Sequence, residues 1–217
     1  HFEARRQRQM CIRDRSTPTT LLLSSVLENV SVPVFAAGGF RDGYGLAAAK
    51  AWGAQGIAMG TRFMMTQESP VPENTKDAYL QAGIDEISVT KKFDGLPHRL
   101  IFNKYIQNID KSNPLKLFFI SLKSAWKYKQ ISQASFGDIV KSFFAMLRGD
   151  DLSISQTIMA ANSPAVIQKA MVEGNPDQGA MPSGQVAGII KEIPSCENLV
   201  KEIIEQYHKA SENLKTL

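Results

Sequence analysis

The stretch Val32-Pro33-Val34-Phe35-Ala36-Ala37-Gly38-Gly39 decides the fold of this 217-residue chain. It is almost wholly apolar and ends in two glycines, which is typical of a strand buried on both faces of a parallel sheet. A second run of this kind, Gly56-Ile57-Ala58-Met59, ends in Gly60. We therefore predict two buried strands, each of which leaves the sheet through glycine.

Helical segments accompany both predicted strands. Leu21–Val30 carries apolar residues at roughly helical spacing. Between the strands, Leu46–Trp52 is rich in helix formers; Asp42 is predicted to cap this helix rather than to bind a ligand, and Gly53 to end it. The order helix, strand, helix, strand with short connections is typical of an α/β barrel or a doubly wound sheet.

The pattern changes after the second strand. Helical residues return over Pro72–Ala82, and Ile87–Thr90 and His98–Ile101 are predicted to form a strand pair. From Asn113 onward the pattern is helical. A final helix is predicted from Ser195, with one apolar face made by Leu199, Val200, Ile203, Ile204 and Tyr207.

Composition excludes several classes of protein. With 43% hydrophobic and 21% charged residues, the chain is predicted to be globular and soluble. No apolar run approaches the ~20 residues that cross a bilayer, so we expect no membrane partner. Two cysteines, Cys11 and Cys196, make neither a disulfide framework nor a metal cluster, which favours the reducing cytoplasm and predicts no metal site.

Residues 1–15 hold most of the net charge. Five arginines stand against Glu3 and Asp14, so this stretch carries +3 of the net +4, and the other 202 residues are nearly neutral. It has no apolar period and lacks the features of a secretory signal. We predict a non-native or disordered leader, with an arginine-rich arm for RNA or anionic surfaces as the alternative. The nearly neutral remainder predicts no nucleic-acid partner.

Chemistry is expected where the two strands end. In a (β/α)₈ barrel the loops after the last two strands frequently bind phosphate through backbone N–H groups. Glycine suits such loops because a Cβ would hold the phosphate oxygens away. Thr61 adds a hydroxyl, and Arg62 adds either a charge near the phosphate or a structural ion pair. Plain tight turns are the alternative.

Two blocks of sequence support a family resemblance. They are Phe35–Ala49 (FAAGGFRDGYGLAAA) and Gly53–Phe63 (GAQGIAMGTRF). In identity, spacing and order they closely resemble the C-terminal, FMN-binding half of the nitronate monooxygenase family, which includes the flavin-dependent enoyl-ACP reductases. The resemblance continues more loosely to about Tyr207.

The resemblance implies the C-terminal part of a TIM (β/α)₈ barrel with a mostly helical cap domain. Residues 16–105 would belong to the barrel, 106–180 to the cap, and 181–217 to a return segment and the last helix. The FMN phosphate would be held by Gly38, Gly39, Ala58, Met59, Gly60 and Thr61. The stretch Met181–Gln185 either turns toward the flavin or is a plain loop-to-helix junction.

A whole barrel takes ~250 residues, and only two clear barrel strands precede the predicted cap. We therefore expect that the chain is truncated at its N-terminus. In the family, a histidine in a Gly-Gly-His loop acts as base or orienting group. None of His1, His98 and His208 lies in such a loop, so no catalytic residue is assigned.

The function that the resemblance implies is FMN-dependent oxidation of an alkyl nitronate by dioxygen, which gives a carbonyl compound and nitrite. The cofactor would carry the redox step. Flavin-dependent enoyl-ACP reduction and a non-catalytic flavin- or phosphate-binding remnant are the alternatives. The oligomeric state stays open, with a homodimer as one alternative. The chain by itself is expected to be inactive.

Overall fold

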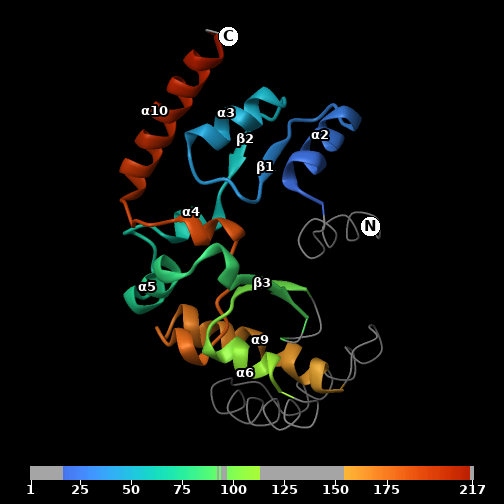
Figure 1. The fold of residues 1–217 in the computed structure, drawn as a ribbon, viewed down its shortest axis with the longest axis vertical. Coiled ribbons are helices and arrows are strands. Elements are labelled where there is room, and N and C mark those ends of the chain that lie inside the picture. Colours follow the sequence, from blue (N-terminus) through green and yellow to red (C-terminus); the bar gives the residue numbers. More distant parts are fainter. Residues whose placement is uncertain (1–16, 92, 94–96, 113–153, 216–217) are drawn as a thin grey trace. The chain divides into compact units, whose positions relative to one another are not determined.

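The computed structural model describes residues 17–91, 93, 97–112 and 154–215 (Figure 1). The chain forms two compact units. The first contains the chain up to Pro70, Tyr79–Asp85 and the chain from Ser183; the second contains Val71–Ala78 and Glu86–Pro182. In the described ranges no helix is both long and apolar enough to cross a membrane.

The first unit is built on a parallel strand pair. Strand β1 (Phe35–Ala37) pairs with β2 (Gly56–Ala58), and their last residues, Ala37 and Ala58, lie in register. Helix α2 (Thr19–Asn29) precedes β1, and α3 (Gly43–Ala51) connects the strands. The predicted order of helix, strand, helix, strand is confirmed, and so is the parallel pairing.

Local signals place helix α3 as predicted. The Asp42 side chain accepts a hydrogen bond from the backbone N–H of Gly45 at 2.8 Å, so Asp42 is the N-cap. Gly53 follows the helix with a φ of +106°, a conformation that residues with a Cβ rarely adopt. Single residues of the sequence therefore predicted both ends of this helix.

Burial of β1 on both faces was predicted, and that prediction is wrong. Ala36 is buried and belongs to a core cluster with Leu23, Ala49 and Ala54, whereas Phe35 is 65% exposed. Alternate residues of a strand face opposite sides of the sheet. Among the residues the structure describes, helices α2 and α3 supply the packing for the Ala36 side only.

Helix α10 (Cys196–Lys215) lies beside α3 (Figure 1). The predicted Ser195 cap is confirmed, since its hydroxyl accepts from the Asn198 N–H at 3.2 Å. The Glu68 carboxylate also accepts from the Cys196 N–H, at 2.8 and 2.9 Å. This second cap comes from a residue 128 positions earlier in the chain.

The predicted apolar face of α10 is only partly buried. Leu199 and Ile203 are buried, whereas Val200 and Ile204 are 47% and 45% exposed. The face that packs is therefore narrower than predicted. Two short helices of the first unit are α4 (Gly60–Met64) and η3 (Gln185–Ile189).

Helix α5 (Glu73–Gln81) confirms the helix predicted near Pro72–Ala82, and η1 (Ile84–Glu86) follows it. In the second unit, β3 (Ile87–Thr90) and β4 (His98–Ile101) form the predicted pair, which is antiparallel. The unit's other described elements are α6 (Lys104–Asp110), α9 (Ile154–Met171) and η2 (Pro176–Gln178).

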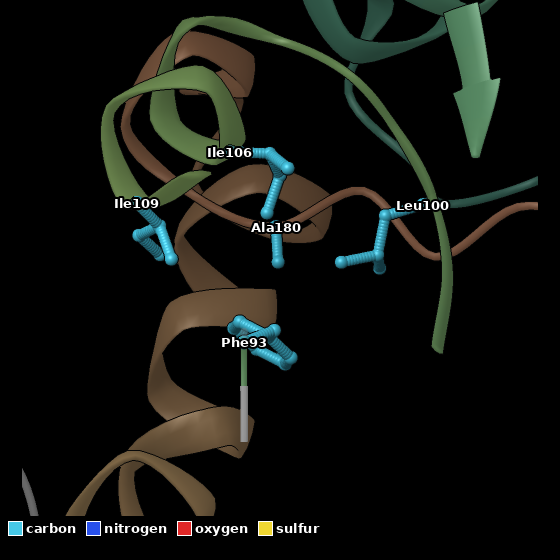
Figure 2. Packing of buried hydrophobic residues seen from close by; sticks show 5 residues of the cluster. All are labelled: Phe93, Leu100, Ile106, Ile109 and Ala180. Carbon is cyan, nitrogen blue, oxygen red and sulfur yellow. The ribbon is translucent and has the colours of Figure 1, made fainter. Parts of the chain in front are cut away.

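Apolar side chains from several segments form the core of the second unit. Figure 2 shows the cluster of Phe93, Leu100, Ile106, Ile109 and Ala180. Because Leu100 of β4 packs in this cluster with α6, the strand pair belongs to the second unit. The division at 105/106 stays a prediction, and the helical stripes predicted between 113 and 153 lie outside the described residues.

Asn103 joins α6 to the segment that follows α9. Its side-chain oxygen accepts from the Ile106 N–H at 3.0 Å, and its amide donates to the carbonyls of Pro176 and Gly179. Asn103→Ala removes a helix cap, worth about 1 kcal/mol, and leaves two carbonyls without this donor. We expect a total loss of about 2–3 kcal/mol, measured by denaturant unfolding.

Asn103→Ser is the matched control, because serine retains a capping oxygen but cannot donate to both carbonyls. Its loss of stability should fall between those of wild type and Asn103→Ala. Equal stabilities of wild type and Asn103→Ala would contradict this assignment.

Candidate functional site

The predicted phosphate loops lie together at one edge of the β1–β2 sheet. Parallel strands have their carboxyl ends at the same edge, and Ala37 of β1 is in register with Ala58 of β2. Gly38-Gly39 and Met59-Gly60 follow directly on these partners. Two segments separated by a helix in the sequence are thus neighbours in space.

The glycines leave open space at this edge. Gly38 and Gly39 have φ values of +96° and +86°, in the left-handed region that favours glycine. A Cβ added at Gly39 or Gly60 would meet no atom within 4 Å. Gly38, Gly39, Ala58 and Gly60 are exposed, and Met59 and Thr61 are half-buried. A bound group can therefore approach the backbone closely at this position.

Backbone donors are available in the second loop. Gly60 and Thr61 begin helix α4, and the first N–H groups of a helix have no acceptor within it. The Met59 side chain does not cap them. The Thr61 hydroxyl oxygen accepts from the Gly184 N–H at 2.9 Å. Since a hydroxyl carries one proton, that proton remains free to donate to another acceptor.

Arg62 forms a structural ion pair. Its guanidinium is buried and donates to the backbone oxygen of Glu192 at 3.2 Å and to its carboxylate at 3.1 Å. Burial lowers the pKa of Arg62, and the Glu192 charge opposes this shift. Of the two roles that the sequence left open for Arg62, the ion pair is the one observed.

Sequence reasoning missed a second arginine. Arg41 donates to the Ile189 oxygen at 2.7 Å and to the Asp42 carboxylate at 3.2 Å. Arg41 and Arg62 line a polar cavity of about 150 Å³ together with Asp42, residues 189–192 and residues of α10. The available signal was the position of each arginine, two residues after the last glycine of a loop.

Two of the histidines lie in the described residues. His98 begins β4, and its ring makes an edge contact with Phe93 at 5.8 Å between centroids. His208 lies on α10 beside Tyr207. No group of three or more histidine, cysteine, aspartate or glutamate side chains with the spacing of a metal site occurs in the part of the chain described here.

The parallel β1–β2 pair with its flanking helices α2 and α3 makes the first unit an α/β structure, with a glycine loop after each strand. The chain matches the profile of the nitronate monooxygenase family over residues 7–206 and belongs to that family. This match begins inside the predicted leader of residues 1–15. The family and its structural neighbours imply a TIM-barrel-type fold.

Curated relatives differ in name and in coverage. A Mycobacterium tuberculosis protein named (3aS,4S,5R,7aS)-5-hydroxy-7a-methyl-1-oxo-octahydro-1H-indene-4-carboxyl-CoA dehydrogenase is 43% identical over 86% of this chain and 53% of its own length. A probable nitronate monooxygenase of Staphylococcus haemolyticus is 38% identical over 42% of this chain and 26% of its own. The chain thus spans about half the length of the first relative, and its match to the second covers about a quarter of that protein.

Solved structures with the same fold include two enzymes. FabK from Thermotoga maritima is 26% identical, with a TM-score of 0.67, over 94% of this chain and 53% of its own. A nitroalkane oxidase from Streptomyces ansochromogenes has a TM-score of 0.59 at 23% identity, over 93% of this chain and 48% of its own. The second likeness concerns the fold alone.

Proposed function

We propose that this chain is the phosphate-binding part of an FMN-dependent oxidoreductase. The residues that would hold the FMN phosphate are Gly38, Gly39, Ala58, Met59, Gly60 and Thr61. The observation that carries the proposal is the meeting of two glycine loops at one sheet edge, with open space where each Cβ would stand. A Cβ at either position would occupy the space that the phosphate needs.

When bound, FMN supplies the electron acceptor, while the protein binds and orients it. The N–H groups of Gly60 and Thr61 and the Thr61 hydroxyl proton are donors of the kind that phosphate oxygens accept. The chain's own contribution is therefore binding and orientation. We propose a cytoplasmic location, on the cysteine content alone.

The first candidate reaction is the oxidation of an alkyl nitronate by dioxygen. It is supported by the family and by the 38% identity to a probable nitronate monooxygenase. That match covers 91 residues. It is therefore too short to include both the glycine loops and the whole of residues 106–180, the predicted substrate domain.

The second candidate is oxidation of a hydroxylated bicyclic acyl-CoA thioester. The match to the CoA dehydrogenase extends over 189 of the 217 residues and must include residues 106–180. Because a cap domain would contact the substrate rather than the phosphate, similarity there favours a shared substrate class. The acyl-CoA thioester is therefore the better supported of the two substrate classes.

The test compares the chain by itself with a completed protein that carries an upstream barrel half before Leu21. We expect the chain by itself to bind FMN weakly and to show no turnover, because two loops hold a phosphate without enclosing the flavin ring. Each substrate is then added to the completed protein, with nitrite release, oxygen uptake and dye reduction as readouts.

Oxidation of the acyl-CoA thioester supports the second candidate, and nitrite release from a nitronate supports the first. Consumption of NAD(P)H with an enoyl thioester identifies a reductase instead. FMN retention without any turnover identifies a non-catalytic flavin-binding protein. Submicromolar FMN binding with turnover by the chain alone would contradict the proposal that this chain supplies only the phosphate-binding part.

A further inference from the structure

The return segment, defined here as Gly184–Glu192, contacts Thr61 of the second phosphate loop and the arginines Arg41 and Arg62. Its first residue donates from the Gly184 N–H to the Thr61 hydroxyl oxygen at 2.9 Å. Further along, the Ile189 oxygen accepts from Arg41 at 2.7 Å. Its last residue, Glu192, accepts two hydrogen bonds from Arg62. Three contacts spread along the segment thus reach Thr61 in the second loop, Arg62 directly after it, and Arg41 two residues after Gly39 of the first loop.

These contacts are directional. Arg62 is 5% exposed, and burial of its charge is costly unless a partner compensates. The Glu192 side chain is 63% exposed, so the pair is buried on the arginine side only. Paired donations to one residue fix the position of the segment, which apolar packing specifies less sharply.

The Gly184 contact also determines the role of Thr61. A hydroxyl that accepts a hydrogen bond from a backbone N–H has its own proton left for a different acceptor. Gly184 therefore orients Thr61 as a donor. A Cβ at position 184 would stand 2.9 Å from the Thr61 hydroxyl oxygen, so glycine permits the approach.

We infer that the return segment is the third side of the phosphate site, and that Gly184, Arg41 and Arg62 are positioning residues that hold it against the two loops. The inference rests on the proposed FMN site. It assigns a role to residues that do not themselves touch the phosphate. Loosening the segment should weaken cofactor binding while leaving the β1–β2 edge folded.

Hydrogen exchange read by mass spectrometry tests this in the chain by itself, with and without millimolar FMN. In Arg62→Met we expect exchange in peptides covering the return segment to rise at least about tenfold, with β1 and β2 unchanged. Arg62→Lys keeps the charge but donates from a single nitrogen, so its exchange should lie between those of wild type and Arg62→Met. Lys50→Met, at an exposed site on α3, is the control and should match wild type.

FMN affinity in the completed protein is the second readout. Arg62→Met should weaken it about tenfold, because a loosened return segment no longer orients the Thr61 hydroxyl toward the phosphate and roughly one hydrogen bond to a charged group is lost. Thr61→Val should also weaken FMN affinity, whereas Thr61→Ser, which retains the hydroxyl, should keep the affinity of wild type. If Arg62→Met fails to fold, Arg41→Met is measured in its place, because it removes one hydrogen bond to the return segment.

The outcomes separate the two proposals. FMN that slows exchange in both loops and in the return segment supports the inference. FMN that protects the loops but not the segment overturns it and leaves the proposed function intact, as does an Arg62→Met variant with loosened segment and unchanged FMN affinity. Absence of FMN binding by the completed wild-type protein overturns the proposed function itself.

Discussion

Gly43→Ala is expected to destabilise the first unit by about 3 kcal/mol, at the upper end of the usual cost of overpacking. Gly43 is the buried first residue of α3, and its N–H donates to the Gln206 side chain of α10 at 2.9 Å. A Cβ there would overlap the Ile203 oxygen and lie 2.5 Å from the Tyr207 nitrogen. Both atoms are backbone, so the two helices must separate.

Thermal unfolding measures this effect, and a loss of that size should lower the midpoint by roughly 6–12 °C. Gly45→Ala is the matched control on the same helix. Its Cβ would meet the Phe40 ring at 3.1 Å, which a side chain can relieve, and alanine favours a helix by up to about 1 kcal/mol. Equal midpoints for the two variants would contradict the close approach of α3 and α10.

Gly60→Val is expected to abolish stable FMN binding by the completed protein without unfolding it. The new side chain would meet no protein atom near its Cβ but would occupy the space assigned to the phosphate. Losing one or two hydrogen bonds to a charged phosphate weakens binding about 10- to 1,000-fold. Flavin absorbance of the purified protein and fluorescence titration measure this loss.

Gly39→Val should have the same effect on FMN, with an added backbone cost because the φ of Gly39 is +86°. Gly53→Val is its matched control: Gly53 also has positive φ and open space at Cβ, but follows α3 away from the loops. It should lose similar stability and retain FMN. If both Gly39→Val and Gly60→Val retained stoichiometric FMN, the two glycines would only form turns and would not belong to the phosphate site.

Local sequence determined the elements near the site. The alternation of helix and strand up to Gly60 follows from apolar runs and helix formers, and Asp42 and Gly53 mark the ends of α3 because capping and positive φ depend on single residues. Because the two strands are parallel, the glycine loops that follow them lie at the same end of the sheet. The cofactor and the reaction came from the family resemblance, since residue patterns alone indicated only a phosphate.

Tertiary structure decided what depends on the path of the chain. Glu68 caps α10, and Arg41 and Arg62 hold the return segment, across separations of 128, 148 and 130 residues. The exposure of Phe35 likewise depends on which elements cover each face of β1. Such pairings leave no periodic signal, because hydrophobic period and capping report only on neighbours within a few residues. Long-range hydrogen bonds depend on how the elements pack, and only the tertiary structure shows that packing.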